Sequence, residues 1–198
     1  MTQIIPKPYW YLRHGETDWN LQGLAQGRTD IPLNETGIAQ ALRAGETLAT
    51  LFCNGERPFD RIVSSPLKRA LTTAQYAQDT IHDRTGIKVP LEINDGLVEV
   101  CFGLHEGASM NEWYTSWIEE GRPLENGESF SDLSARAVSA INVELEKDGT
   151  PLFVAHGALF RGIRAGMNLP VNVRLPNAIP LHIIPNSREW SIKIINKY

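Results

Sequence analysis

The sequence predicts an α/β fold, in which short buried strands alternate with amphipathic helices. Two apolar runs carry most of this prediction, because each ends in a His-Gly pair, at His14 and at His156. Between them, short apolar runs alternate with segments whose apolar residues recur at helical spacing. Ligands bind outside the carboxyl ends of strands in such sheets, so we expect the two histidines to converge on one site.

The composition predicts one soluble globular domain that spans residues 1–198, with 42% hydrophobic and 21% charged content. A net charge of -4 argues against nucleic acid or an anionic membrane as a partner. Cys53 and Cys101 stand far apart, so neither a disulfide framework nor a metal site is expected, and the reducing cytoplasm is the predicted location. Neither an apolar leader nor an apolar run of membrane-spanning length occurs. The oligomeric state stays open, a homodimer included.

The first strand, with Tyr9-Trp10-Tyr11 at its centre, leads into Arg13-His14-Gly15, whose guanidinium and imidazole suit an anion such as phosphate. An ordinary strand exit with solvated charges is the alternative. The long polar segment 15–33 follows, and segments of this kind are often functional. Its Asn20 and Gln26 are candidate ligand contacts, with surface turn chemistry as the alternative.

A helix is predicted to begin at the N-cap Asn34 and to end before Gly55 and Pro58. The run 59–64 then predicts a buried strand, and Ser65-Pro66 the start of a second helix with proline at its first position. This places Arg69 within the first two turns, near the carboxyl end of the strand. An exposed helical charge is the alternative interpretation of Arg69.

Residues 87–93 predict another strand, and a glycine-punctuated stretch with Glu99 among apolar neighbours follows. Desolvation there would raise the pKa of Glu99 toward use as a general acid, unless the side chain points to water. Ser109 and Glu112 form the pattern of a capping box for a helix that ends at Gly121.

The last third of the chain predicts a helix over about 131–147, the strand 151–155 that ends at His156, and a further helix. A lone His156 would more often be a core histidine, but its context matches that of His14. The segments 178–184 and 189–196 predict two more strands, and Pro180 indicates an edge position for the first of them.

Taken together, these motifs resemble the histidine phosphatase superfamily, also called the phosphoglycerate mutase-like family, over nearly the full chain. The resemblance rests on five motifs in the family's order: Arg13-His14-Gly15-Glu16-Thr17 with its loop, Ser64-Ser65-Pro66-Leu67-Lys68-Arg69, Leu97-x-Glu99-x-x-Phe102-Gly103-x-x-Glu106-Gly107, Gly127-Glu128-Ser129 and Ala155-His156-Gly157. It implies a three-layer α/β/α sandwich with a mostly parallel central sheet, which agrees with the alternation described above.

The resemblance also implies roles for individual residues. His14 matches the nucleophile that becomes phosphorylated, and the phosphate pocket is completed by Arg13, Arg69 and His156. Glu99 matches the family's proton donor. Asn20 and Gln26 match loop positions that tend to contact phosphate or substrate, and no metal or cofactor is implied. The implied activity is a metal-independent phosphomonoesterase that acts on a small phosphorylated metabolite.

The sequence differs from the mutase pattern at two places, and both differences favour a hydrolase over a 2,3-bisphosphoglycerate-dependent phosphoglycerate mutase. The residue after Glu99 is Val100, where the mutases have an arginine for the substrate carboxylate, and the mutases' basic insertion is absent between Gly107 and Gly121. A non-catalytic module that binds phosphorylated ligands is a further alternative. The substrate is not readable, although four side chains are predicted to wall the pocket: Trp19, His105, Trp113 and Trp117.

Overall fold

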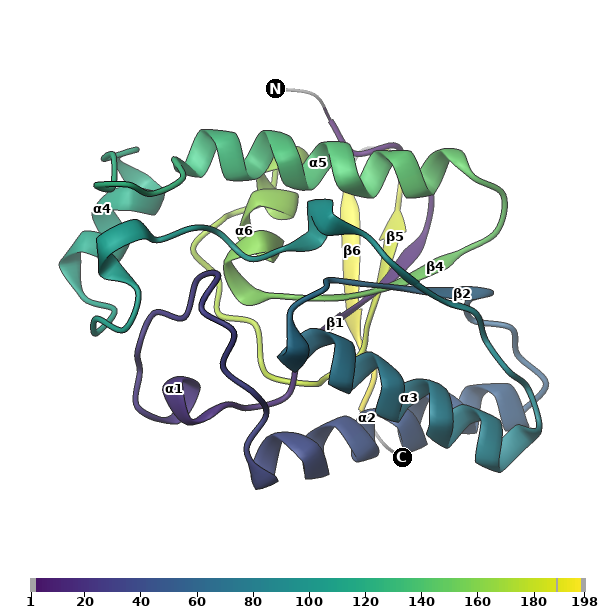
Figure 1. Ribbon diagram of the computed structural model, residues 1–198. Coiled ribbons are helices and arrows are strands. Elements are labelled where there is room, and N and C mark those ends of the chain that lie inside the picture. The colour runs from purple at the N-terminus through teal and green to yellow at the C-terminus, as the bar shows by residue number, and fades with distance from the viewer. Residues whose placement is uncertain (1–2, 188, 197–198) are drawn as a thin grey trace.

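The computed structural model describes residues 3–187 and 189–196, and it is a six-stranded sheet between two layers of helices (Figure 1). The strands are β1 (Tyr9–Arg13), β2 (Arg61–Ser64), β3 (Leu91–Ile93), β4 (Pro151–Ala155), β5 (Leu181–Pro185) and β6 (Trp190–Ile194). The helices are α1 (Asp18–Leu21), α2 (Glu35–Cys53), α3 (Lys68–Thr85), α4 (Glu112–Glu119), α5 (Phe130–Glu146) and α6 (Gly157–Gly166), with 3-10 turns η1 (Asp95–Leu97) and η2 (Gly103–His105). The expected three-layer α/β/α sandwich is confirmed.

The strand order is β3-β2-β4-β1-β5-β6. The first four strands in this order run parallel, whereas β5 and β6 pair antiparallel to their neighbours. The carboxyl ends of β2, β4 and β1 therefore lie next to one another at one edge of the sheet. Residues that directly follow these three strands are brought together there, although they are far apart in the sequence.

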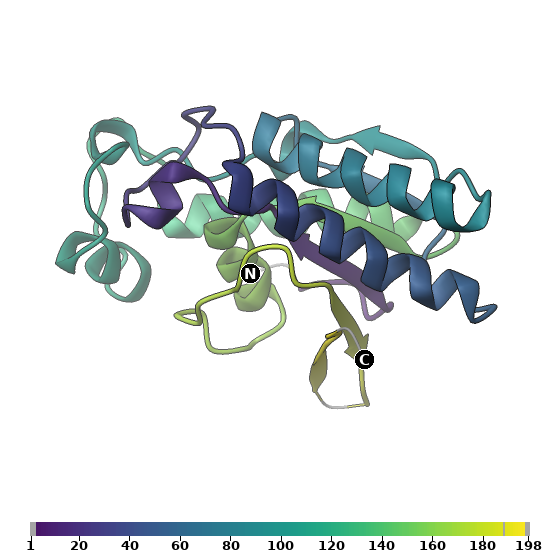
Figure 2. The same cartoon turned by 90° about the horizontal axis from the view of Figure 1, so that it is seen from below.

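The two helical layers are fixed by the alternation of side chains along the strands. In β1, Tyr9 and Tyr11 join the core formed with α5 and α6, and Trp10 and Leu12 join the core formed with α2 and α3. All four side chains are buried. Figure 2 shows α2 and α3 side by side on their face of the sheet.

Two predicted helix starts are wrong. The helix after β2 begins at Lys68, with Leu67 as its N-cap, so Ser65 and Pro66 lie before it. Ser65 instead accepts from the Leu67 N–H at 3.3 Å and faces a histidine described below. The helix expected from Ser109 begins at Glu112, because Asn111 supplies the capping oxygen to the Trp113 N–H at 3.4 Å.

The Pro180 prediction is also wrong, because β5 lies between β1 and β6 and β6 forms the edge. Pro180 precedes β5, and its carbonyl accepts from the Ile195 N–H at 2.9 Å. Two predicted strands are shorter than expected, since regular pairing is limited to Arg61–Ser64 and Leu91–Ile93. Within the described residues, the helices lack the length and apolar character needed to cross a membrane.

Candidate active site

The residues at the centre of the site directly follow three neighbouring strands. His14 follows β1, His156 follows β4 and Ser65 follows β2. Backbone bonds continue the sheet register through them, from the His14 N–H to the Ala155 carbonyl and from the Ser65 N–H to the Val154 carbonyl, both at 3.0 Å. The rings of His14 and His156 lie 5.3 Å apart between centroids. The predicted convergence of the two histidines is confirmed.

The His14 ring is fixed in one tautomer. Its Nδ1 lies 2.7 Å from the Gly15 carbonyl oxygen, which only accepts, so Nδ1 carries the proton and Nε2 keeps its lone pair. Burial, followed by the charges of Arg13 and Arg69, holds the pKa of His14 well below its ordinary value of 6.5. The imidazole is therefore neutral and nucleophilic at neutral pH.

Gly15 lets the chain turn tightly after this histidine. A Cβ at Gly15 would lie 2.4 Å from the carbonyl oxygen of Gly37 in the first turn of α2, a clash with backbone that cannot move aside. The Gly15 N–H donates to the Thr73 hydroxyl of α3 at 3.0 Å. The glycine of the opening motif thus allows α2 and α3 to close around His14.

His156 is held from both sides. The Tyr11 hydroxyl donates to its carbonyl at 2.8 Å and accepts from its N–H at 3.1 Å. Its Nε2 lies 2.7 Å from the Ser65 hydroxyl, whereas its buried Nδ1 has no partner among the described residues. Burial and the charge of Arg69 hold the pKa of His156 well below 6.5. Sequence reasoning assigned Ser65 to a helix cap and missed this contact.

Two arginines flank the histidines, and both are held by backbone carbonyls. Arg69 is 1% exposed and donates to the Gly27 carbonyl at 2.7 Å and to the Thr29 carbonyl at 2.9 Å. Arg13 donates to the Leu175 carbonyl at 2.6 Å, and burial lowers its pKa to about 10. Each keeps a buried Nε without a partner in the described chain. The interpretation of Arg69 as an exposed helical charge is wrong.

Glu99 is 7% exposed, so the expected burial of its carboxyl group is confirmed. The carboxylate accepts from the Val100 N–H at 3.0 Å and from two N–H groups in the first turn of α6, Ala158 at 3.0 Å and Leu159 at 2.8 Å. The first turn of α6, which follows His156, thereby orients the Glu99 carboxylate. An acidic group at a helix N-terminus also complements the helix dipole.

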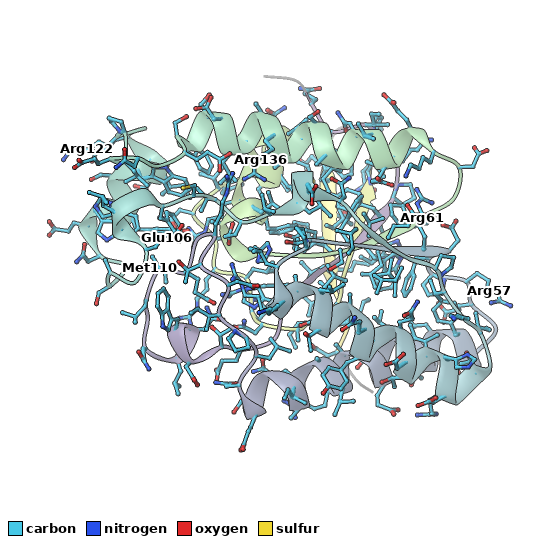
Figure 3. The ribbon with its side chains drawn as sticks, viewed as in Figure 1. Arg57, Arg61, Glu106, Met110, Arg122 and Arg136 are labelled. Atoms are coloured by element: carbon cyan, nitrogen blue, oxygen red, sulfur yellow. The ribbon has the colours of Figure 1, made fainter. Side chains whose placement is uncertain are left out.

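Arg136 of α5 supports the segment that carries Glu99, and Figure 3 labels it above that segment. It donates to the Gly96 carbonyl at 2.9 Å and to the Val98 carbonyl at 2.8 Å. Glu128 of the Gly-Glu-Ser motif accepts from this guanidinium twice, at 2.9 Å in each case. The motif therefore positions Glu99 through Arg136, and Ser129 caps α5.

A cavity of about 390 Å³ opens beside these groups. Six of the predicted site residues line it: Arg13, His14, Asn20, Gln26, Arg69 and Glu99. The Thr17 hydroxyl donates to Gln26 Oε1 at 2.9 Å, and the Asn177 amide donates to Asn20 Oδ1 at 3.1 Å. Within residues 3–187 and 189–196, this cavity included, no cluster of three His, Cys, Asp or Glu side chains is arranged to hold a metal ion.

The four predicted wall residues do not line this cavity, so that prediction is wrong. Trp117 is fully buried in the core, and His105 packs against Trp113 with 4.4 Å between ring centroids. The apolar wall comes instead from Leu24, Phe102, Met110 and Tyr114. Sequence reasoning also missed polar wall residues that lie in or after α6, where only the final fold brings them near His14: Arg161, Asn172, Arg174 and Asn177.

Glu106 anchors the loop that holds Arg69, and Figure 3 labels it on the segment between η2 and α4. Its carboxylate accepts from the N–H groups of Arg28 and Thr29, both at 2.9 Å, from the Phe102 N–H at 3.3 Å, and from the Thr29 hydroxyl. The carbonyls of this loop then accept from Arg69. Glu106 therefore acts on the site through the loop.

We expect Glu106→Gln to lower the free energy of unfolding by about 2 kcal/mol, because a charged acceptor of several partly buried donors is lost. The looser loop should also reduce kcat/KM about tenfold for the phosphomonoesterase activity that the resemblance implies. Urea unfolding and steady-state kinetics measure both effects. Glu125→Gln is the matched control, because this glutamate is exposed and its side chain forms no hydrogen bond or ion pair with the residues that the structure describes. Equal behaviour of the two variants would contradict the anchoring role.

Because His14 and His156 are buried, we expect the free energy of unfolding to fall as the pH is lowered. Unfolded histidines bind protons below about pH 6.5, whereas the depressed pKa values of His14 and His156 keep the folded rings neutral there. Lowering the pH from 7 to 5.5 therefore favours the unfolded chain, by about 2 kcal/mol for the pair. Urea titrations of wild type and His14→Asn at the two pH values test this. The variant should lose about 1 kcal/mol less, and an identical pH dependence would contradict the assignment.

Comparisons with known proteins agree with the resemblance that the sequence motifs carry. A family model described as the histidine phosphatase superfamily (branch 1) matches residues 9–195. The chain is 35% identical over 190 residues to a Bacillus subtilis (strain 168) protein named Uncharacterized phosphatase PhoE, with 93% of this chain and 92% of that protein covered. It is 29% identical over 194 residues to the 2,3-bisphosphoglycerate-dependent phosphoglycerate mutase of Bartonella quintana (strain Toulouse), with 89% and 91% covered.

The fold is also similar to a solved structure of a phosphoserine phosphatase mutant from Entamoeba histolytica in complex with phosphoserine. The TM-score is 0.73 at 28% identity, and the superposition covers 95% of this chain and 96% of that one.

Proposed function

Because the chain belongs to the histidine phosphatase superfamily, we propose that it hydrolyses small phosphomonoesters through a phosphohistidine formed at His14. One observation carries this proposal. Beside the neutral His14, three buried nitrogen atoms have no hydrogen-bond partner among the described residues: Arg13 Nε, Arg69 Nε and His156 Nδ1. Buried polar groups are normally satisfied, and a phosphoryl group supplies the acceptor oxygens that these donors lack.

In the first half of the reaction, His14 Nε2 attacks phosphorus in line with the ester oxygen. The N–P bond forms as the P–O bond breaks, and Glu99 gives its proton to the departing alkoxide. Arg13 and Arg69 neutralise the charge on the equatorial oxygens, and His156 donates a further hydrogen bond. Glu99 is suited to this step because it lines the same cavity as His14.

In the second half, water attacks the phosphohistidine. Glu99, now ionised, takes a proton from the water as the O–P bond forms, and the N–P bond breaks to release His14 and inorganic phosphate. The N–H groups of Ala158 and Leu159 hold the carboxyl group of Glu99 in place for both steps. The two arginines supply the positive charge that phosphoryl transfer needs, so we propose that the reaction requires no metal ion.

Hydrolysis of para-nitrophenyl phosphate in the presence of a chelator tests this function. Wild type should turn over the ester at an undiminished rate after metal removal. Absence of turnover with every phosphomonoester tested would favour a non-catalytic module that binds phosphorylated ligands. Restoration by a divalent cation would contradict metal independence.

Phosphoglycerate mutase is the second candidate, since the chain is similar to a mutase over most of its length. Val100, which stands where the mutases have an arginine, is fully buried in the core and does not line the cavity. A direct assay of 2,3-bisphosphoglycerate-dependent interconversion of phosphoglycerates separates the two activities. We expect hydrolysis to dominate, and interconversion faster than phosphate release would favour the mutase.

Glu99→Gln tests the acid role through the leaving group. An amide cannot protonate an alkoxide, so we expect kcat to fall by about 10²–10⁴-fold for alkyl phosphates, whose leaving groups are poor. Para-nitrophenolate needs little protonation, so the loss with that ester should be at least about tenfold smaller. Equal losses on the two kinds of ester would indicate that Glu99 only shapes the site.

A further inference from the structure

A second cavity lies behind one wall of the catalytic cavity. It has a volume of about 470 Å³ and is enclosed by α2, the segment 174–180 and the residues that follow β6. The lining of this rear pocket includes Gln40, Arg43, Thr47, Arg174, Ile179 and Ile195. Arg174 and Asn177 line both cavities, so the segment 174–178 is the wall that separates them.

The rear pocket is positively charged. Arg43 and Arg174 are both exposed to solvent, and neither side chain forms an ion pair with the residues that the structure describes. Among those residues, no aspartate or glutamate lines the pocket. The whole chain carries a net charge of -4, so the positive charge is local to this cavity. Two guanidinium groups without a counter-charge indicate an anionic occupant.

Much of the remaining surface of the rear pocket is apolar. Five side chains provide it: Ala44, Pro176, Ile179, Pro180 and Ile195. Gln40 adds a polar group, because its Oε1 accepts from the Glu16 N–H at 2.8 Å and its amide N–H groups are left for a ligand oxygen. Cations beside an apolar surface suit a ligand that joins an anionic group to an apolar body.

The wall between the two cavities is bonded to the opening motif. The Asn177 amide donates to the His14 carbonyl, and the Ala178 N–H donates to the Arg13 carbonyl, both at 3.0 Å. The Leu175 carbonyl accepts from the Arg13 guanidinium in return. Ala178 has a φ of 47°, in the left-handed region that favours glycine, so the wall keeps this conformation at a cost in free energy. A ligand that stabilises the wall therefore also stabilises Arg13 and His14.

We propose that the rear pocket is a regulatory site for a small organic carboxylate with an apolar body. The carboxylate binds Arg43 of α2 and Arg174 of the wall, and so it ties the wall to α2. The bound ligand favours the conformation in which Arg13 and His14 are in place, and it therefore activates the enzyme. This effector is not a substrate, so the site goes beyond the proposed function. A carboxylate fits two exposed guanidinium groups and one amide, whereas the phosphoryl group takes the buried clamp.

Isothermal titration calorimetry with 2-naphthoate, in the absence of substrate, tests the binding. 2-Naphthylmethanol lacks the charge and acetate lacks the apolar body, so each should bind at least about tenfold more weakly. Arg43→Gln should raise the Kd of 2-naphthoate at least about tenfold, and Arg43→Lys should raise it less, because the charge remains without the planar fork. Equal Kd values for 2-naphthoate and 2-naphthylmethanol would overturn the anion site.

Arg57→Gln is the matched control for net charge. Arg57 is an exposed arginine that precedes β2, and Figure 3 shows it at the far end of the molecule from Met110 of the catalytic cavity. This variant should keep the wild-type Kd. An equal loss of affinity in Arg43→Gln and Arg57→Gln would mean that overall charge attracts the ligand, and it would overturn the site.

The regulatory effect is measured with para-nitrophenyl phosphate. 2-Naphthoate should raise kcat/KM about fivefold in wild type and in Arg57→Gln, and it should have no such effect in Arg43→Gln. A raised KM with unchanged kcat in all three proteins would place 2-naphthoate in the catalytic cavity and overturn the proposal. Binding through Arg43 without a change in kcat/KM would overturn the regulatory role. Binding through Arg43 by a protein that hydrolyses no ester would overturn the proposed function, while the anion site would stand.

Discussion

Replacing His14 with alanine is expected to lower kcat for phosphomonoester hydrolysis by at least about 10⁴-fold, because no other group can form the covalent intermediate. The neighbouring His156 cannot substitute, since its Nε2 is bound to Ser65 and the backbone on either side of it is held by Tyr11. Stopped-time assays of phosphate release from para-nitrophenyl phosphate measure the loss.

The control for His14→Ala is His82→Ala, at an exposed histidine on α3. This variant should retain wild-type turnover. Thermal unfolding of both variants separates loss of chemistry from loss of fold. Substantial residual hydrolysis by folded His14→Ala would rule out the covalent mechanism.

The second large effect is expected for Arg69→Gln. This variant loses a buried cation on the phosphoryl oxygens, and kcat/KM should fall about 10³-fold. It also loses the bonds to the Gly27 and Thr29 carbonyls, so the free energy of unfolding should fall by about 1–3 kcal/mol. Arg69→Lys should recover only a small part of the activity, because one ammonium group cannot reproduce the planar fork.

Lys68→Gln is the matched control for Arg69, since this neighbouring cation is exposed at the start of α3 and does not line the cavity. It should leave both kcat/KM and stability near wild type. If Arg69→Gln lowered stability and left kcat/KM unchanged, Arg69 would be a loop anchor only.

The buried strands and the residues that end them could be predicted from the sequence. β1 and β4 are continuous apolar runs that each end in His-Gly, and a parallel sheet places such ends together whatever lies between them. Helices with clear apolar spacing, such as α2 and α5, could also be predicted from the sequence. His14 as the candidate nucleophile, both flanking arginines and His156 could be predicted from these elements together with the family resemblance.

The cavity walls could not be predicted in the same way. Ser65 resembles a helix cap, and only the neighbouring positions of β2 and β4 reveal its contact with His156. Arg161 and Arg174 lie in segments whose local pattern indicates nothing about a ligand. Trp113 and Trp117 have the size of pocket residues, but they pack together with Phe102 instead. These positions depend on contacts between distant segments, which local periodicity does not contain.

Rapid-quench labelling with a ³²P-phosphomonoester tests the central claim most directly. The account predicts that wild type, stopped in the pre-steady state, carries one phosphoryl group that is labile in acid, stable in alkali and located on His14 by peptide mapping. Glu99→Gln should accumulate more of this species with para-nitrophenyl phosphate, because hydrolysis of the phosphohistidine lacks its base. Release of product at the full rate without any labelled enzyme, or label on a residue other than His14, would contradict the account.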